Sequence, residues 1–246
     1  EHGMHAQPLD LIVAETQGSI GYMLQQAMSN SLRRIGINRT VLTVVTQVRV
    51  DANDADFEHP TKPIGDFMSE ADARAFEAKG WRVIEDAGRG WRRVVPSPMP
   101  RQIIEQHAIR KLIDQGYVVI ACGGGGIPVI RNDNGSLRSV AAVIDKDHAS
   151  SLLAQSLNAD LLLISTGVER IAVHYHSPQQ HDLTFVSHRE LEDYRRQGHF
   201  PEGSMGPKID AVLAFIRQGG PEAIITDPPN LIRAVLGETG THIQPG

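Results

Sequence analysis

The sequence predicts an α/β protein whose mostly parallel sheet is covered by helices on both faces. Amphipathic helical segments and short apolar segments alternate along most of the 246 residues. Repeated helix–strand units of this kind are joined by right-handed crossovers, which place helices on both sides of the strands. No sequence period of about 20–50 residues recurs, which argues against a solenoid.

The first half of the chain is expected to begin with a long helix at 9–37. Apolar residues recur there at helix spacing, and Gly36 marks the C-terminal stop. The β-branched run at 40–50 predicts one strand. The polar segment 51–69, which contains prolines, predicts a loop long enough to carry function or to move. The other elements of this half are a helix at 70–80, two short strands around a glycine turn at 81–98, a helix at 100–116 and a buried strand at 117–122.

The second half continues the alternation of helices and strands. The expected helices lie at 145–159, 187–198, 206–219 and 229–238, and the expected strands at 160–166, 222–226 and, as an edge strand, 240–245. His174 and His176 alternate on a further expected strand. A metal site is one explanation of the histidines, but no spacing resembles H-E-x-x-H, so scattered surface histidines are favoured. Residues 51–98 differ from the alternating pattern. We therefore predict one domain over 1–246 with a lid subdomain inserted at 51–98.

Composition argues against several classes of protein. The net charge of −5 lacks the basic excess that is typical of nucleic-acid binding. Cys122 is the single cysteine, so no internal disulfide can form, as expected in a reducing compartment. No apolar run approaches the roughly 20 residues of a membrane-spanning helix. We therefore predict a soluble cytoplasmic protein that binds neither nucleic acid nor membrane.

Four consecutive glycines follow the buried strand at 117–122: Gly123, Gly124, Gly125 and Gly126. In open α/β sheets, ligands bind beyond the carboxyl ends of the strands. Bare backbone at such a place can direct several N–H groups at an anion or a small polar substrate. A tight turn packed against a neighbour is the alternative, but one or two glycines would suffice for it. The letters fit neither a dinucleotide-binding nor a Walker fingerprint, so a ligand loop of another kind is favoured.

Three lysines lie on separate loops or turns. Lys146 stands between Asp145 and Asp147, where an apolar strand gives way to a helix. Lys208 lies at the start of a helix, where a cation needs an anionic partner to offset the helix dipole. Lys62 lies between two prolines of the long loop. A solvated ion pair is the usual explanation of a charged run. Lysines on three glycine- or proline-bounded loops nevertheless indicate phosphate handling, because phosphoryl transfer needs mainly positioning and positive charge.

Several blocks of the sequence carry a family resemblance. In chain order they are TQGSIGY, PTKPIG, EDAGRGWRRVVPSP, ACGGGGIPV, VIDKDHAS, GSMGPK and GETGTHI. The chain resembles the carbamate kinases of the amino-acid kinase superfamily in these blocks, over nearly its whole length. The resemblance implies a three-layer αβα sandwich, a homodimer and a place in nitrogen-compound catabolism. The implied reaction is reversible phosphoryl transfer between carbamoyl phosphate and ADP, giving ATP and carbamate, with Mg²⁺ accompanying the nucleotide.

The resemblance also implies roles for individual residues. It places Lys62, Lys146 and Lys208 against the transferring phosphoryl group, and it makes Asp147 the residue that organises these lysines. The four glycines would line the pocket for the carbamoyl group. Two turns would border the adenine nucleotide, one made of Ser165, Thr166, Gly167 and Val168 and one containing Met205, Gly206 and Lys208. It implies no metal-ligating side chain.

Departures from the family pattern leave other functions open. The segment LLISTGVERIAVHY lacks an acidic residue of the family's nucleotide turn, and Met99 stands where many relatives have lysine. One alternative is a kinase of another small acid on the same fold. A second is a non-catalytic paralogue that binds a carbamoyl or nucleotide metabolite. The family's first strand and two glycine loops would precede PLDLIVAETQGSIGY, so we expect the functional protein to carry further residues before Glu1.

Overall fold

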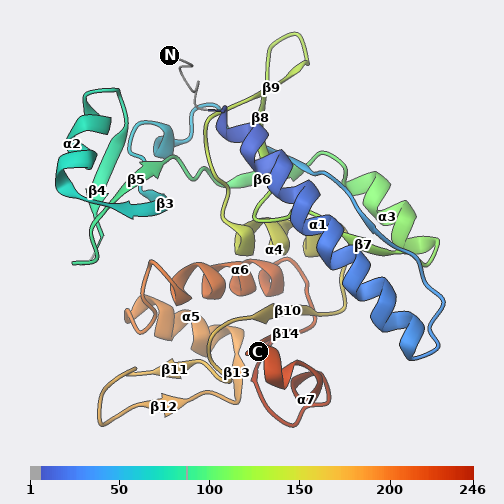
Figure 1. Cartoon of the computed structure of the whole chain (residues 1–246). Coiled ribbons are helices and arrows are strands. Elements are labelled where there is room, and N and C mark those ends of the chain that lie inside the picture. The colour runs from blue at the N-terminus through green and yellow to red at the C-terminus, as the bar shows by residue number, and fades with distance from the viewer. Residues whose placement is uncertain (1–6, 87) are drawn as a thin grey trace. The chain divides into compact units, whose positions relative to one another are not determined.

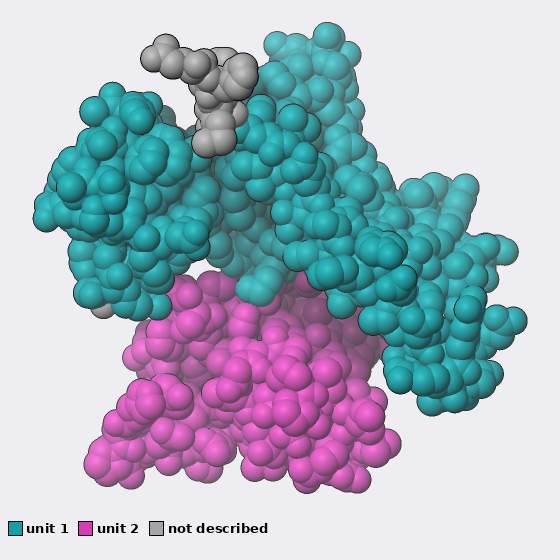
Figure 2. All heavy atoms as spheres, in the orientation of Figure 1, with its two compact units in different colours: residues 1–146 teal, residues 147–246 magenta. Residues whose placement is uncertain are grey.

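A computed structural model describes residues 7–86 and 88–246 of the chain. The described residues fall into two compact units, which divide between Lys146 and Asp147 and have different colours in Figure 2. Helices and strands alternate along both units, and both contain parallel strand pairs (Figure 1). The predicted α/β class is therefore confirmed.

The first unit contains one long helix, two shorter helices and three small sheets in its described residues. The helices are α1 (Leu9–Arg34), the 3-10 turn η1 (Ala55–Phe57), α2 (Glu70–Glu77) and α3 (Gln106–Asp114). The parallel pair consists of β1 (Val41–Thr43) and β7 (Val118–Ile120). The four-stranded sheet has the order β6 (Pro100–Ile103), β2 (Gln47–Val50), β8 (Ile127–Arg131) and β9 (Leu137–Ser139). The three-stranded sheet has the order β3 (Lys62–Met68), β5 (Trp91–Val95) and β4 (Arg82–Glu85).

The second unit is built around a four-stranded mixed sheet. Its strand order is β10 (Leu162–Ser165), β14 (Ala223–Thr226), β15 (Thr241–Gln244) and β13 (Phe185–Ser187). A short hairpin pairs β11 (Ala172–Val173) with β12 (His181–Asp182). The helices are α4 (Lys146–Ser156), which begins at the last residue of the first unit, α5 (His188–Arg196), α6 (Met205–Arg217), the 3-10 turn η2 (Pro228–Asn230) and α7 (Leu231–Val235).

Helix α6 supplies much of the core of the second unit. Ile209, Val212, Leu213 and Ile216 recur every three or four residues and are buried, as the core-facing stripe of an amphipathic helix requires. They share one cluster with residues of β10, β14 and β15. Because Lys208 lies in the first turn of this anchored helix, its backbone is fixed by the core.

The predicted single strand at 40–50 is wrong, because the structure divides it into β1 and β2, which belong to different sheets. The break lies at Thr46, whose backbone N–H and carbonyl both bond to the side chain of Gln17. A backbone whose polar groups are taken by a side chain is less available to a ladder.

The predicted loop at 51–69 is wrong for its second half, because Lys62 begins strand β3. Pro63 is tolerated there because β3 is an edge strand of its sheet. The predicted helix at 100–116 is wrong for its first residues, because Pro100–Ile103 form strand β6. Strand β6 is also an edge strand, so Pro100 is tolerated at its start.

Two strand predictions in the second unit are also wrong. Strand β15 is not an edge strand, because it pairs with β13 on one side and β14 on the other. His174 and His176 follow β11 and do not alternate on it. Their φ angles of 52° and 62° are in the left-handed region, which a continuing strand cannot adopt.

Candidate active site

The glycine run forms a turn, and close packing requires glycine at three of its four positions. A Cβ at Gly123 would lie 2.6 Å from Cγ of Gln17, and Cβ atoms at Gly125 and Gly126 would collide with the carbonyl oxygen of Ile144 and with the side chain of Val48. All three also have positive φ angles, which favour glycine. At Gly124, in contrast, a Cβ would meet no atom within 4 Å. Packing therefore explains three of the glycines, although one or two were expected to suffice for a packed turn. Gly124 is the remaining position, and a ligand can approach the backbone there.

A buried glutamine on α1 holds this turn in place. Gln17 is 3% exposed, and its amide donates to the carbonyl of Thr46 at 3.1 Å and accepts from the N–H of Thr46 at 2.9 Å. Oγ1 of Thr46 in turn accepts from the N–H of Cys122 at 2.9 Å. The carbonyl of Cys122 accepts from the N–H of Gly125 at 2.7 Å. The conformation of the glycine turn is thus fixed from the middle of α1.

Cys122 itself has no nucleophilic character in this structure. The residue is 3% exposed, and burial, with a smaller contribution from the charge of Glu105, raises the pKa of its thiol to about 12. The thiolate is the reactive form of cysteine. Because the thiol stays protonated near neutral pH, we exclude Cys122 as a catalytic nucleophile.

Lys62 forms an ion pair inside the first unit. Its Nζ lies 2.8 Å from Oδ2 of Asp145, and the two side chains are 35% and 12% exposed. Asp145 follows Ile144, whose carbonyl oxygen lies against Gly125. The segment before it is tied down by the bond from the N–H of Val143 to the carbonyl of Pro96. The structure therefore brings Lys62, Asp145 and the glycine turn together within one unit.

Lys208 forms a second ion pair, inside the second unit. Its Nζ lies 2.8 Å from Oδ2 of Asp147, and the side chains are 12% and 9% exposed. Asp147 lies in the first turn of α4, where a carboxylate is favoured by the helix dipole. One turn further along the same helices, Oγ of Ser151 donates to the carbonyl of Ala211 at 2.7 Å. Because residues four apart share a helix face, these two bonds join one side of α4 to α6.

Two different aspartates each fix one of the three lysines that the family resemblance places against the phosphoryl group. Asp147 bonds Lys208, whereas the carboxylate of Asp145 bonds Lys62. Lys146 is exposed and stands between these two buried aspartates in the chain. The three consecutive residues therefore carry an exposed cation flanked by two carboxylates that each fix another lysine.

The turn from Ser165 to Val168 follows β10 at the carboxyl end of a parallel pair. Ser165 is in register with Thr226 of β14, and the N–H of Thr166 donates to the carbonyl of Thr226 at 2.8 Å. A Cβ at Gly167 would meet no atom within 4 Å, so the turn leaves open space there. Such a place beyond the strand ends of an α/β sheet is suited to a ligand.

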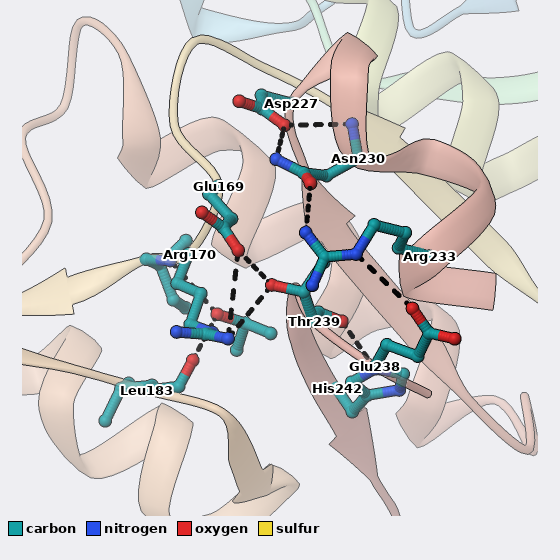
Figure 3. A network of polar contacts seen from close by, with 11 residues as sticks. Glu169, Arg170, Leu183, Asp227, Asn230, Arg233, Glu238, Thr239 and His242 are labelled. Carbon is teal, nitrogen blue, oxygen red and sulfur yellow. Dashed lines mark hydrogen bonds and ion pairs between the residues drawn. The ribbon is translucent and has the colours of Figure 1, made fainter. Parts of the chain in front are cut away.

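A polar network fixes the chain directly after this turn (Figure 3). Nη2 of Arg170 donates to Oγ1 of Thr239 at 2.9 Å, and the same hydroxyl donates to the carboxylate of Glu169. His242 continues the network, with Nε2 3.0 Å from the carbonyl of Thr239 and Nδ1 2.9 Å from the carboxylate of Glu222. The network therefore ties the turn after β10 to the segment that leads into β15.

Sequence reasoning missed several residues that position the site. Asp145 was recognised as part of a charged run, but only the fold shows that it holds Lys62. Gln17 gave no signal, because a glutamine on a helix looks like a surface residue until its amide is seen to bond Thr46. Arg170 and Thr239 gave none either, since 69 residues separate them in the chain.

The described part of the chain shows no dedicated metal site. Among these residues, no group of three or more histidine, cysteine, aspartate or glutamate side chains is arranged to hold a metal ion. Residues 7–86 and 88–246 also contain no helix that is both long enough and apolar enough to cross a membrane.

Comparison with known sequences supports the resemblance in the sequence. The pattern of the amino acid kinase family matches residues 5–227. The chain is 54% identical over 243 residues to the carbamate kinase-like protein YahI of Escherichia coli, and the aligned region covers 98% of this chain and 77% of that protein. It is 49% identical over 245 residues to the carbamate kinase of Pyrococcus horikoshii, covering 99% of this chain and 78% of that protein.

Comparison with solved structures agrees. A carbamate kinase from Giardia lamblia bound to AMP-PNP superimposes with a TM-score of 0.91 at 41% identity, covering 100% of this chain and 78% of that one. A protein from Aeropyrum pernix superimposes with a TM-score of 0.94 at 39% identity, covering 100% of this chain and 79% of that one. The expected amino-acid kinase fold is therefore confirmed.

Proposed function

The chain belongs to the amino acid kinase family, and from this membership we propose that it is a phosphotransferase of the carbamate kinase type. The proposed reaction moves a phosphoryl group between carbamoyl phosphate and ADP, giving ATP and carbamate. The support for carbamoyl phosphate as substrate is the identity of about half of the residues to a named carbamate kinase over 99% of the chain.

The observation that carries the proposal is that each unit contains a lysine fixed by an aspartate. Lys62 and Lys208 each lie 2.8 Å from an aspartate that flanks Lys146. A lysine held by a carboxylate keeps its position, and preorganised charge stabilises a transition state without reorganisation. We assign Lys62, Lys146 and Lys208 to the oxygens of the transferring phosphoryl group, and Asp145 and Asp147 to fixing Lys62 and Lys208.

The chemistry demands little else from the protein. The bond from phosphorus to the carbamate oxygen breaks, a bond from phosphorus to an oxygen of ADP forms, and carbamate leaves as an anion. Phosphoryl transfer of this kind depends on positioning and on neutralising charge. The open backbone at Gly124 suits a small planar carbamoyl group, because no side chain lies within 4 Å of where its Cβ would be.

The nucleotide is proposed to use the second unit. The open turn Ser165–Val168 and the start of α6, with Met205, Gly206 and Lys208, are the proposed contacts, and α6 packs on β10, which ends in Ser165. Mg²⁺ is proposed to arrive with the nucleotide. Mg²⁺ commonly binds through substrate phosphates and one or two carboxylates. Asp145 and Asp147 already bond lysines, so we expect the phosphates of the nucleotide to supply most of its ligands. Such a cation would neutralise phosphate charge.

A coupled assay of ATP formation tests the proposal. Purified protein with ADP, Mg²⁺ and carbamoyl phosphate should form ATP, and acetyl phosphate in place of carbamoyl phosphate serves as the comparison for a kinase of another small acid. Calorimetric binding of ADP without any ATP formation would favour the non-catalytic paralogue instead. Formation of ATP from acetyl phosphate alone would overturn the proposed substrate.

Two further features of the family are proposed for this chain. A homodimer is supported by large apolar side chains exposed on α1, namely Leu11, Ile12, Ile20, Tyr22, Met23, Leu24 and Met28, since monomers rarely expose such a set. Light scattering after gel filtration tests it. A cytoplasmic place in nitrogen-compound catabolism is supported by the single cysteine and by the proposed substrate.

The lid at 51–98 also remains a proposal. Segment 51–61 is tied to the chain after β5, because Asp54 and Asp56 accept from the N–H groups of Met99 and Ser97. A closing lid would become harder to cut when substrates bind. We expect limited proteolysis within 51–61 to slow when ADP and carbamoyl phosphate are added, whereas equal rates would indicate a static connection.

A further inference from the structure

One arginine of α5 binds two carboxylates that flank Lys208 in the chain. Nε and Nη2 of Arg195 each lie 2.9 Å from an oxygen of Asp210, and Nη1 and Nη2 each lie 2.7 Å from an oxygen of Glu202. Glu202 is the first residue of the turn at 202–204, and Asp210 follows Lys208 by two residues on α6. We call these three residues the Arg195 clasp. The guanidinium thus forms two forks, each a pair of hydrogen bonds to one carboxylate: one fork holds the turn at Glu202, and the other holds helix α6 at Asp210.

Gly206, which follows the turn, lies close to the side chains of Arg195 and Glu202. A Cβ at Gly206 would lie 3.1 Å from the carbonyl of Pro201, 3.3 Å from Nη2 of Arg195 and 3.3 Å from Oε2 of Glu202. These contacts are tighter than ordinary van der Waals distances, so a side chain at 206 would displace the arginine, the glutamate or the backbone by a few tenths of an ångström. The N–H groups of Ser204 and Gly206 both donate to the carbonyl of Pro201, at 3.2 and 2.8 Å.

The charges of the clasp reinforce one another. Asp210 and, to a smaller extent, Glu202 raise the pKa of the Arg195 guanidinium, and Arg195 lowers the pKa of the Glu202 carboxyl. Arg195 and Glu202 are therefore ionised near neutral pH. Bidentate pairs between a guanidinium and a carboxylate are both strong and geometrically specific.

We propose that Arg195 is a positioning residue for phosphoryl transfer, which sets the place of Lys208 and of the nucleotide-binding turn by clasping Glu202 and Asp210. It contacts neither substrate nor phosphoryl group in this proposal. It acts through Gly206, which lies against its guanidinium, and through α6, whose first turn carries Lys208. The inference rests on the proposed function for its kinetic consequence, but its structural content concerns the second unit alone.

The two forks of the clasp should have different effects. The side chain of Glu202 is 80% exposed, so its fork is screened by solvent and holds only the loop. The side chain of Asp210 is 37% exposed and that of Arg195 is 18% exposed, so the second fork is better protected and holds the helix itself. Loss of the first fork should weaken nucleotide binding, whereas loss of both should also misplace Lys208.

Steady-state kinetics with varied ADP tests these consequences. In Glu202→Gln we expect KM for ADP to rise about two- to fivefold, as for an exposed ion pair, with kcat changed less than about twofold. In Arg195→Gln we expect KM to rise and kcat to fall, each by about tenfold or more, as for lost hydrogen bonds between charged groups. Arg195→Lys should resemble Arg195→Gln, because lysine keeps the charge but cannot form the two forks.

The neighbouring residue supplies a matched control. Arg196 is 72% exposed and pairs with Asp193 one turn away on α5. Arg196→Gln makes the same change of charge on the same helix, and both kinetic constants should stay within about twofold of the unaltered protein, as expected for a surface pair. A variant that binds and turns over ADP normally without Arg195 would overturn the proposal, and so would full rescue by Arg195→Lys.

Hydrogen exchange separates the clasp from the proposed reaction. The amides of Ser204 and Gly206 should exchange about tenfold faster or more in Arg195→Gln, and should be unchanged in Arg196→Gln, whether or not the protein turns over carbamoyl phosphate. Protected amides in Arg195→Gln would overturn the clasp even if the enzyme is active. Absence of ATP formation by the unaltered protein would instead reject the proposed function and leave the exchange result to decide the clasp.

Discussion

Replacing Lys208 by alanine should lower the stability of the second unit. The ion pair between Lys208 and Asp147 is 2.8 Å long, and its side chains are 12% and 9% exposed. Removing one partner of a buried pair costs about 3–5 kcal/mol, because the remaining charge stays in a poorly solvated place. We expect the free energy of unfolding to fall by about this amount in urea titrations followed by circular dichroism.

The same substitution should also lower phosphoryl transfer. We expect kcat/KM for ATP formation to fall at least about a hundredfold, which corresponds to about 2.7 kcal/mol of transition-state stabilisation. A double variant, Lys208→Met with Asp147→Asn, separates the two effects. It removes both charges and so should recover most of the stability, but it cannot recover the charge that the phosphoryl group needs.

Lys111→Ala is the control for both measurements, because Lys111 is an exposed residue of α3. It should change neither the free energy of unfolding nor ATP formation. A folded Lys208→Ala protein with near-normal turnover would refute the assignment of Lys208 to the phosphoryl group. A double variant that turns over normally would refute the assigned roles of both members of the pair.

Lys146→Ala should lower ATP formation at least about a hundredfold, because this exposed cation is assigned to the transferring phosphoryl group. Calorimetry should find that ADP binding changes less, and a matching loss of ADP affinity would contradict the assignment. Gly126→Ala should destabilise the protein in urea titrations by about 1–3 kcal/mol, because residue 126 has a φ angle of 91° and a Cβ there would collide with Val48. Gly124→Ala, by contrast, should leave stability nearly unchanged and raise KM for carbamoyl phosphate; unaltered kinetics would show that no substrate approaches Gly124. Burial raises the pKa of Cys122 from 9.0 to about 12, so the unfolded chain loses this proton at lower pH than the folded one. The free energy of unfolding should therefore fall by up to about 1.4 kcal/mol per pH unit from pH 9 towards pH 12, relative to Cys122→Ala, and a parallel pH dependence of the two proteins would contradict the shift.

Local signals in the sequence were enough to predict most helices and several strands. The periodic apolar residues of α1 and the glycine that follows it predicted that helix almost residue by residue. The run at 117–122 predicted β7, because an apolar run bounded by glycines has few other solutions, although the residues of β7 are half-buried and not buried as predicted. These elements are specified by their own residues.

What the sequence could not predict depends on distant partners. Thr46 interrupts a β-branched run only because Gln17, 29 residues earlier, bonds its backbone. Lys62 looked like a loop residue between prolines, yet it begins β3, which pairs with β5 as an edge strand, where Pro63 needs no N–H. Strand β15 looked like an edge because it comes last in the chain, whereas the order of strands in a sheet is not their order in the sequence.

The candidate site shows the same division. The lysines and glycines were recognised from their neighbours in sequence, including Lys62, Lys146 and Lys208. Their partners were not, because each ion pair joins residues far apart: 83 positions separate Lys62 from Asp145, and 61 separate Lys208 from Asp147. A pattern of residues predicts the chemistry of a site, but the contacts that orient its side chains follow from tertiary structure.

Phosphorus NMR of a reaction mixture tests the central claim most directly. Protein, ADP, Mg²⁺ and carbamoyl phosphate are mixed, and the signals of the γ-phosphate of ATP and of carbamoyl phosphate are followed together. We predict that the γ-phosphate signal grows as the carbamoyl phosphate signal falls, and that Lys146→Ala slows this growth at least about a hundredfold. Carbamoyl phosphate that decays only to inorganic phosphate, at the same rate with and without the protein, would contradict the claim.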